Sequence, residues 1–231
     1  MTADGAAASL QGLPSSSSAG LSMASPLATL TPSLADDLRR FERNGMQTEL
    51  IEVLAASMRH GRNLLVSLEY GNHALELTLY PSHRLMHCPL PLQRLLSLQL
   101  SDLFVQSVTL APRRLPVLTR LPSAEQALYG SMAPLGWELA LRGARCELLP
   151  EIPSQAAFRI PPGVTVQGVD LHGTMAAAIH RLRREATNLK EMSAWAGFDR
   201  ERAMRLLNGL YLQSALMATR AHPAACSDVF N

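Results

Sequence analysis

Hydrophobic and polar positions recur along this chain with two different periods, and the changes of period divide it into segments. From Ser33, the expected N-cap, apolar residues of 34–41 recur at helical spacing until Gly45. A second helical stripe covers residues 48–58 and is expected to stop at Gly61. The pattern therefore predicts two helices ahead of the first strand.

The period then changes from helical spacing to strict alternation. Residues 64–70 and 74–80 alternate at period two, and residues 71–72, Gly-Asn, lie between them. Alternating runs joined by such a pair are typical of a β-hairpin with a tight turn. Residues 84–88 and 103–110 alternate in the same way, so the sequence predicts a small antiparallel sheet.

A more irregular stretch follows the sheet segments. Residues 123–135 predict a helix that opens at its serine and is kinked or ended by Pro134. Residues 137–141 predict a second short helix, and residues 145–149 predict a strand. Helices around a small antiparallel sheet define an α+β fold class.

Composition sets the boundaries between the parts of the chain. The first residues are rich in Ala, Ser, Pro and Gly and carry little charge, so they cannot bury enough surface to offset chain entropy. Four prolines and one glycine between residues 150 and 163 mark an internal boundary. The predicted parts are a disordered leader at 1–33, an α+β domain at 34–150, a Pro-rich linker at 151–170, a helix-turn-helix-like module at 171–222 and a tail at 223–231.

The sequence LKEMSAWAGFDRERAMRLL, residues 189–207, is the most specific stretch of the chain. A helical stripe over residues 175–186 precedes it, and a short helix over residues 189–196 is expected to end at Gly197. Asp199 is the expected N-cap of a third, longer helix. The stretch therefore predicts three helices separated by sharp turns.

This stretch resembles bacterial helix-turn-helix and winged-helix modules over about 50 residues. Their pattern places a small residue in the second helix, a glycine four positions later and apolar positions beyond the turn, which this chain supplies with Ser193, Gly197, Phe198, Ala203 and Leu206. The resemblance implies that the small serine and the glycine let the third helix approach closely. It also implies that the apolar positions dock that helix.

The residues after the third helix extend the resemblance. Residues 216–220 look like the first wing strand of a winged-helix module, so the fold expected for the C-terminal part is a tri-helical winged-helix-like module. An α+β domain followed by a small helical module is also similar to two-part bacterial signalling proteins. The resemblance implies a regulatory protein.

Projection of the third helix, residues 199–217, at 100° per residue divides its side chains between two faces. One face is apolar and is expected to be buried. The other face combines groups that suit the phosphates and base edges of DNA with groups that suit a protein surface. The candidate partner- or DNA-binding residues on that face are Arg202, Arg205 and Asn208, which favour DNA, and Glu201 and Leu212, which favour a protein.

Charge weighs against DNA as the main partner. The chain of 231 residues has a formal net charge of +2. Residues 172–222 contain eight Lys or Arg and four acidic residues, a mild excess for a DNA-binding domain. A protein partner is therefore the main prediction, and double-stranded DNA bound through the third helix is the alternative.

Other residues give weaker patterns. His83, His87 and Cys88 lie close in sequence, but on a strand the histidines and the cysteine would face opposite sides, so half-buried histidines are expected rather than a metal site. Trp195 is expected either to anchor a partner if exposed or to fill the tri-helical core if buried.

No nucleotide-binding, hydrolase or metalloprotease motif is present, so the sequence predicts no catalytic residue, cofactor or metal.

The sequence shows neither a secretory signal nor a membrane-spanning segment. The N-terminus lacks the pattern of a secretory signal, and no apolar run is long enough to span a membrane. The three scattered cysteines suit free thiols in a reducing compartment. The sequence thus predicts a cytoplasmic, non-enzymatic bacterial regulatory or signalling protein that docks partners through its α+β domain and its winged-helix-like module. The alternative is a transcription regulator whose third helix enters the major groove.

Overall fold

The computed structural model describes residues 30–112, 114–168 and 172–225. The predicted leader at 1–33 lies outside these residues except for its last positions, as does most of the predicted tail at 223–231. The predicted α+β class is confirmed by helices packed on a five-stranded antiparallel sheet. The strands of this sheet, in their spatial order, are β4 (Leu103–Leu110), β1 (Leu64–Tyr70), β2 (His73–Tyr80), β3 (Leu85–His87) and β5 (Tyr129–Ser131).

The hairpin of β1 and β2 forms where the alternation predicts it. Leu64 pairs with Leu79 and Tyr70 with His73, so Gly71 and Asn72 make the turn. Alternate apolar residues of both strands point into the core, and the residues between them lie on the other face of the sheet. The core residues are Leu64, Val66 and Leu68 of β1 and Leu75, Leu77 and Leu79 of β2. Because side chains alternate along a strand, a pattern read from one segment fixes both its face and its register.

Two helices precede the sheet, as the pattern predicts, and their ends explain the breaks. Helix α1 spans Pro32–Asn44 and α2 spans Leu50–His60, and the glycines at 45 and 61 take positive φ angles at their C-termini. The predicted N-cap at Ser33 is wrong. Thr31 holds that position and Pro32 is the first helical residue, where the missing N–H of proline costs nothing.

The region after the sheet segments departs from the prediction. The expected helix over residues 123–135 is in fact α4 (Ser123–Gln126), then β5, and then α5 (Met132–Arg142). Pro134 neither kinks nor ends a helix, because it lies in the first turn of α5, where no i−4 carbonyl awaits an N–H. Ser131 caps this helix by accepting a hydrogen bond from the backbone N–H of Ala133 at 3.2 Å.

Residues 145–149, predicted as a strand, form a loop that an arginine fixes in place. Arg145 donates to Glu49 Oε2 and Glu52 Oε1 of the α2 region, at 2.7 Å each, and to the carbonyl of Leu148. Although burial opposes ionisation, these carboxylates raise the pKa of the Arg145 guanidinium. The apolar pair at 148–149 reflects contact with the core rather than strand pairing.

The remaining described elements are short. They are α3 (Leu92–Leu96) and the 3₁₀ turns η2 (Gly45–Gln47), η3 (Pro81–His83), η4 (Leu100–Asp102) and η5 (Leu118–Arg120). None of the helices in the described ranges is long and apolar enough to cross a membrane.

The C-terminal unit contains three helices and a small sheet: α6 (Gly173–Arg184), α7 (Leu189–Ser193), α8 (Arg200–Leu212), β6 (Ala157–Arg159) and β7 (Met217–Thr219). A strand, β7, forms at the position predicted for the wing strand, but it pairs with β6, which precedes the helices in the chain. Strand β6 lies within the segment predicted as a linker, and Phe158 at its centre is fully buried and bridged to Thr187. This part of the linker segment is therefore a core element of the C-terminal unit.

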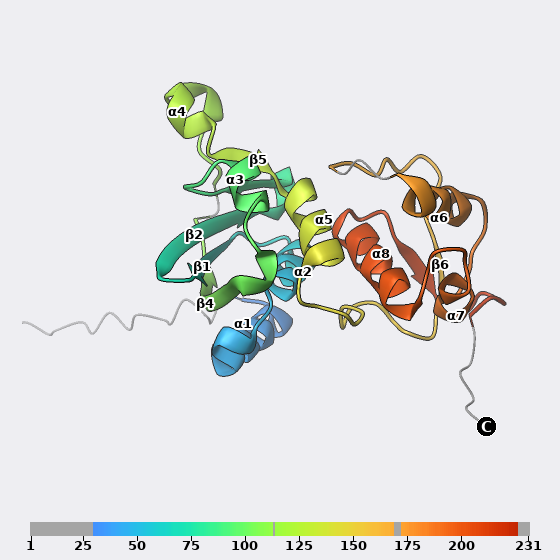
Figure 1. Ribbon diagram of the computed structural model, residues 1–231. Helices are drawn as coiled ribbons and strands as arrows, with labels where there is room; N and C mark the ends of the chain where they lie inside the picture. The colour runs from blue at the N-terminus through green and yellow to red at the C-terminus, as the bar shows by residue number, and fades with distance from the viewer. Residues whose placement is uncertain (1–29, 113, 169–171, 226–231) are drawn as a thin grey trace, which may run out of the picture.

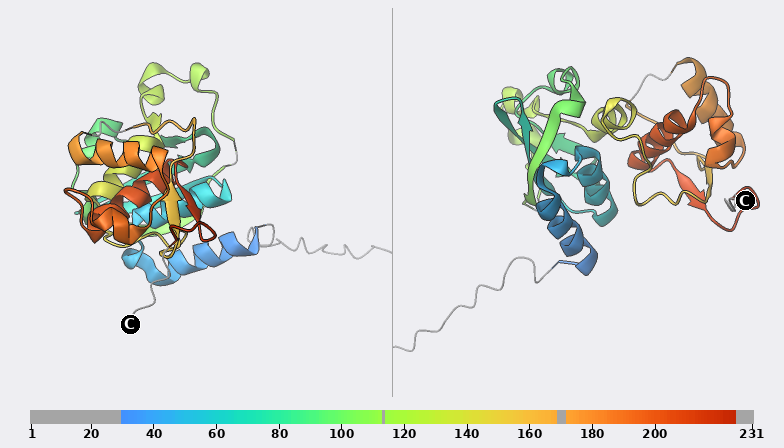
Figure 2. Two further views of the ribbon diagram at one scale, coloured as in Figure 1. Left: turned by 90° about the vertical axis from the view of Figure 1, so that its right-hand side faces the viewer. Right: turned by 60° about the horizontal axis from the view of Figure 1, so that its bottom comes forward.

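The two units are packed into one layered molecule. Figure 1 shows the sheet on one side, α2 and α5 between the sheet and α8, and α6, α7 and β6 beyond α8. The right view of Figure 2 shows the same two units side by side from another direction. Trp137 of α5 is fully buried in the contact, and its Nε1 donates to the Gln167 carbonyl at 2.8 Å. Helix α8 thus lies between the α5 layer and the rest of the C-terminal unit.

Candidate docking surface

Only the first turn of α8 keeps the exposure that its projection predicts. Asp199 caps the helix as expected, because its Oδ1 accepts a hydrogen bond from the backbone N–H of Arg202 at 2.7 Å. Glu201 and Arg202 are both exposed. These two residues remain available to a partner.

Asn208 does not lie on the surface, contrary to the prediction. It is fully buried, and both ends of its amide are satisfied by the loop after α5. Its Oδ1 accepts from the Leu149 N–H at 2.9 Å, and its Nδ2 donates to the Glu147 carbonyl at 2.8 Å. An amide held in this way is a structural link between the two units and cannot reach a base edge.

Arg205 and Leu212 are also turned towards the chain itself. Arg205 donates to the carbonyl of Gly143 at 2.9 Å, just beyond the C-terminus of α5, and forms an ion pair with Glu201 at 2.8 Å. Leu212 is buried against Gly136 of α5. The prediction that this face points outward is wrong, because α5 covers it. A major-groove role for α8 through Arg205 and Asn208 loses its basis.

The exposed chemistry of the C-terminal unit lies instead at the corner between α6, α7 and α8. The Arg181 guanidinium lies 4.6 Å from the centroid of the Trp195 ring. Trp195 meets Phe198 edge to face, with ring centroids 6.1 Å apart. Arg202 lies 5.4 Å from the centre of the Phe198 ring. We call these four residues the aromatic row: Arg181, Trp195, Phe198 and Arg202.

Local sequence explains why the row forms. Gly197 adopts a φ of +74°, which reverses the chain after α7 and brings Phe198 next to Trp195. A Cβ on this glycine would lie 2.8 Å from Thr174 of α6, so the turn also packs closely against that helix. Arg202 is then held over the turn, because it donates to the Gly197 carbonyl at 2.9 Å.

The row belongs to a basic surface. Arg181 pairs with Glu185, but both side chains are half exposed, and such pairs stabilise a protein by only about 0.2–0.5 kcal/mol. Other exposed cations of the unit form no ion pair within the described parts of the chain: Arg183, Arg184, Lys190, Arg200, Arg202 and Arg220. A negatively charged partner would therefore meet cations that are not already neutralised.

The indole N–H group of Trp195 is the polar group of the row that lacks a hydrogen bond among the described residues. The residue is half-buried, whereas its Nε1 is buried and has no hydrogen-bond partner among the described residues. The other tryptophan, Trp137, does use its Nε1, in the bond to Gln167. Trp195 is thus neither the fully exposed anchor nor the simple core residue that the sequence left open. It combines an accessible ring with an unused donor.

The histidine–cysteine cluster is dispersed by the fold. His83 is exposed in η3, and the His87 ring contacts the Tyr129 ring in a tilted arrangement with ring centroids 4.7 Å apart. Cys88 is buried, and burial raises the pKa of its thiol. Within the described ranges, no group of three His, Cys, Asp or Glu side chains could hold a metal ion.

Comparison of the chain with protein-family models, curated proteins and solved structures finds no match of any kind. The resemblance of residues 189–207 to helix-turn-helix modules accordingly rests on the sequence motif alone. The sequence did not show that the members of the aromatic row form one site. Arg181 and Trp195 are 14 positions apart, and the turn at Gly197 brings Phe198 to Trp195.

Proposed function

We propose that this chain is a non-enzymatic regulatory protein whose C-terminal, winged-helix-like unit docks an acidic segment of a protein partner on the aromatic row. The single observation that carries the proposal is the partly exposed Trp195 ring between Arg181 and Phe198, on a unit whose other exposed cations form no ion pair among the described residues. Tryptophan and arginine are the residues that most often contribute binding energy at protein interfaces.

The contacts within the aromatic row are weak enough for a partner's groups to replace them. A cation–π contact at an exposed site contributes about 0.5–1 kcal/mol. The Arg181–Glu185 pair adds little to this, because both of its side chains are about half exposed. A partner carboxylate can therefore replace Glu185 at small cost, while apolar groups of the partner cover the Trp195 ring.

Protein is a better-supported partner than duplex DNA. Reading of the major groove requires a helix or a β-ribbon that can enter it. Most of α8 is buried on both sides, and α7 has only five residues. The cations are also spread over α6, α7, α8 and the end of β7 rather than along one helix face.

The proposal can be tested with labelled peptides of one length and increasing glutamate content, with mixed-sequence duplex DNA as the competing probe. Peptide affinity for the full chain is expected to rise with glutamate content. Bound peptide is also expected to protect Trp195 from acrylamide quenching, whereas Trp137 is inaccessible throughout because it is fully buried. Trp195→Ala and Arg181→Ala are each expected to weaken peptide binding about tenfold.

Arg183→Ala is the matched control. It removes the same charge from the same helix, but Arg183 touches neither ring in the contacts described above. If Arg183→Ala and Arg181→Ala weaken binding equally, the attraction is general electrostatics and the aromatic row is not the site. If duplex DNA binds more tightly than every peptide, with an affinity that falls steeply with salt, the DNA alternative is correct instead.

A further inference from the structure

Residues 112–127, of which all but 113 are described, form an arm that stands away from the body of the α+β domain. Figure 1 shows α4 at its end, well clear of the sheet. The arm is attached at its two ends, where Asn63 donates to the Pro112 carbonyl at 2.7 Å and the Cys88 N–H donates to the Leu128 carbonyl at 3.0 Å. The other hydrogen bonds of its described residues stay within the arm, and none of these residues is buried.

The arm nevertheless carries apolar side chains. Val117 is 56% exposed, and three leucines of the arm are only partly buried, at 115, 118 and 121. Prolines at 112, 116 and 122 restrict the backbone, which reduces the entropy lost when the arm is ordered. An apolar, stiffened arm that buries none of its side chains in its own chain is suited to binding another molecule.

A groove with exposed apolar walls lies between η2, the start of β4 and the end of α5. It encloses about 180 Å³, which suits one or two apolar side chains rather than a small-molecule ligand, whose sites measure about 300–1,000 Å³. Met46 and Phe104 flank it and are 54% and 42% exposed. Among the described residues, these two, Val117 and Met217 are the large hydrophobic side chains with high exposure.

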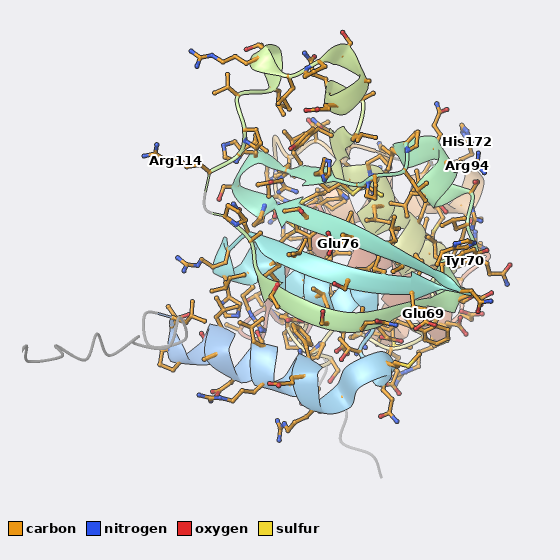
Figure 3. All side chains as sticks on the ribbon, turned by 90° about the vertical axis from the view of Figure 1, so that its left-hand side faces the viewer. Glu69, Tyr70, Glu76, Arg94, Arg114 and His172 are labelled. Atoms are coloured by element: carbon orange, nitrogen blue, oxygen red, sulfur yellow. The ribbon has the colours of Figure 1, made fainter. Side chains whose placement is uncertain are left out.

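The arm carries a net positive charge, whereas the residues beside the groove are acidic. The described part of the arm has two arginines, Arg114 and Arg120, against one carboxylate, Glu125, and Figure 3 shows Arg114 pointing away from the body. Beside the groove, Asp102 is the last residue of η4, and Glu69 pairs across the sheet with Phe104. Within the described ranges, neither arginine and neither of the two carboxylates beside the groove forms an ion pair with another residue.

We infer that a second copy of this chain occupies the groove. The arm of one copy places Val117 between Met46 and Phe104 of the other copy, and its arginines face the carboxylates beside the groove. One contact thereby covers three of the four highly exposed hydrophobic side chains and neutralises unpaired charges on both sides. A two-fold arrangement makes the contact twice, because each copy supplies one arm and one groove. The inference is independent of the docking function proposed above, since no residue is shared with the aromatic row.

Sedimentation velocity of the full chain across the micromolar range tests the inference. The chain is expected to dimerise, and Val117→Asp and Phe104→Asp are each expected to raise the dissociation constant of the dimer tenfold or more, about 1.4 kcal/mol. Met217→Asp is the matched control, because it places the same charge on an equally exposed hydrophobic site of the C-terminal unit. Circular dichroism checks that each variant keeps its fold, and Val117 is the safer site because it has no buried contact to lose.

Charge reversal identifies the contact more specifically. One variant carries Arg114→Glu and Arg120→Glu, and the other carries Glu69→Lys and Asp102→Lys. Each variant alone is expected to remain monomeric at concentrations where the native chain dimerises. An equal mixture of the two is expected to associate, because one of its two arm–groove contacts is native and the other is restored with reversed charges.

A native chain that stays monomeric throughout overturns the inference. So does a dimer that Val117→Asp and Phe104→Asp leave intact, or one that Met217→Asp weakens as strongly. Binding of acidic peptides at the aromatic row is unaffected by any of these results.

Discussion

Replacement of Gly209 by alanine tests the packing of α8 against α5. Gly209 lies inside α8, where its backbone faces the Trp137 ring. A Cβ built at this position would lie 2.1 Å from Cζ3 and 2.4 Å from Cε3 of Trp137, far closer than carbon atoms pack. One of the two helices, or the ring, must therefore move in the variant.

The sign of the effect depends on whether the ring can withdraw. In an open helix interior, alanine is more stable than glycine by about 0.5–1 kcal/mol. Here Trp137 is fully buried and its Nε1 is anchored to the Gln167 carbonyl, so the ring has no free space to enter. Overpacking of a close-packed core costs about 1–3 kcal/mol. We therefore expect Gly209→Ala to lower the free energy of unfolding by about 1–2 kcal/mol, which is opposite to its intrinsic helical effect.

Gly136→Ala is the matched control, because this glycine lies in α5 on the other side of the same contact. A Cβ there would lie 3.5 Å from Leu212 Cβ and 3.6 Å from Gln213 Nε2, which are ordinary contact distances. The control is therefore expected to leave stability unchanged or raise it by up to about 1 kcal/mol. Urea unfolding followed by far-UV circular dichroism measures both variants, with an unchanged m-value as the check that the same surface unfolds.

A double variant separates the clash from other effects. Trp137→Phe removes the ring atoms that the new methyl group would meet, so Gly209→Ala is expected to be less destabilising, or stabilising, in that background. If Gly209→Ala raises the stability of the otherwise native chain as much as Gly136→Ala does, the ring does not lie against α8 as described. The packing that withdraws Asn208 and Leu212 from the surface would then be wrong as well.

Two further predictions concern buried polar groups. Asn208→Ala is expected to lower the free energy of unfolding by about 2–4 kcal/mol, because it leaves two backbone groups of residues 147–149 without partners; a loss below about 1 kcal/mol in urea unfolding would contradict this. At Asp37, burial alone would raise the carboxyl pKa, but hydrogen bonds with His60 and Arg59 outweigh it and hold the pKa below 3.8. The native chain is therefore expected to be more stable than Asp37→Asn above that pH and to lose this advantage as the pH falls through the lowered pKa, and an advantage that persists in strong acid would refute the assignment.

The sequence predicts a structural feature well when the residues that cause the feature lie within one short segment. The hairpin of β1 and β2 needs only alternation and a Gly-Asn turn, and both are adjacent in the chain. Helix ends at Gly45, Gly61 and Asp199 likewise depend on backbone geometry within a few residues. These predictions succeed because their physical cause is local.

The sequence fails where a distant contact decides the outcome. The loop at 145–149 has the alternation of a strand, but Arg145 is held by Glu49 and Glu52, almost a hundred positions earlier. Strand β6 was hidden in a proline-rich segment, because its partner β7 lies about 60 residues later. Neither pairing leaves a signal in the segment itself, because the pairing free energy comes from residues far away in the chain.

Helix α8 combines features that the local sequence predicts with a contact that depends on distant residues. The local sequence predicts that a capped helix begins at Asp199 and that its second face carries a glycine and a leucine suited to packing against a protein surface. That this surface is α5 of the same chain follows from the three-dimensional packing alone, because the contact depends on where Trp137 and Gly136 lie in space. The same packing leaves the exposed chemistry to Trp195 and its arginines, which the turn at Gly197 gathers from separate helices.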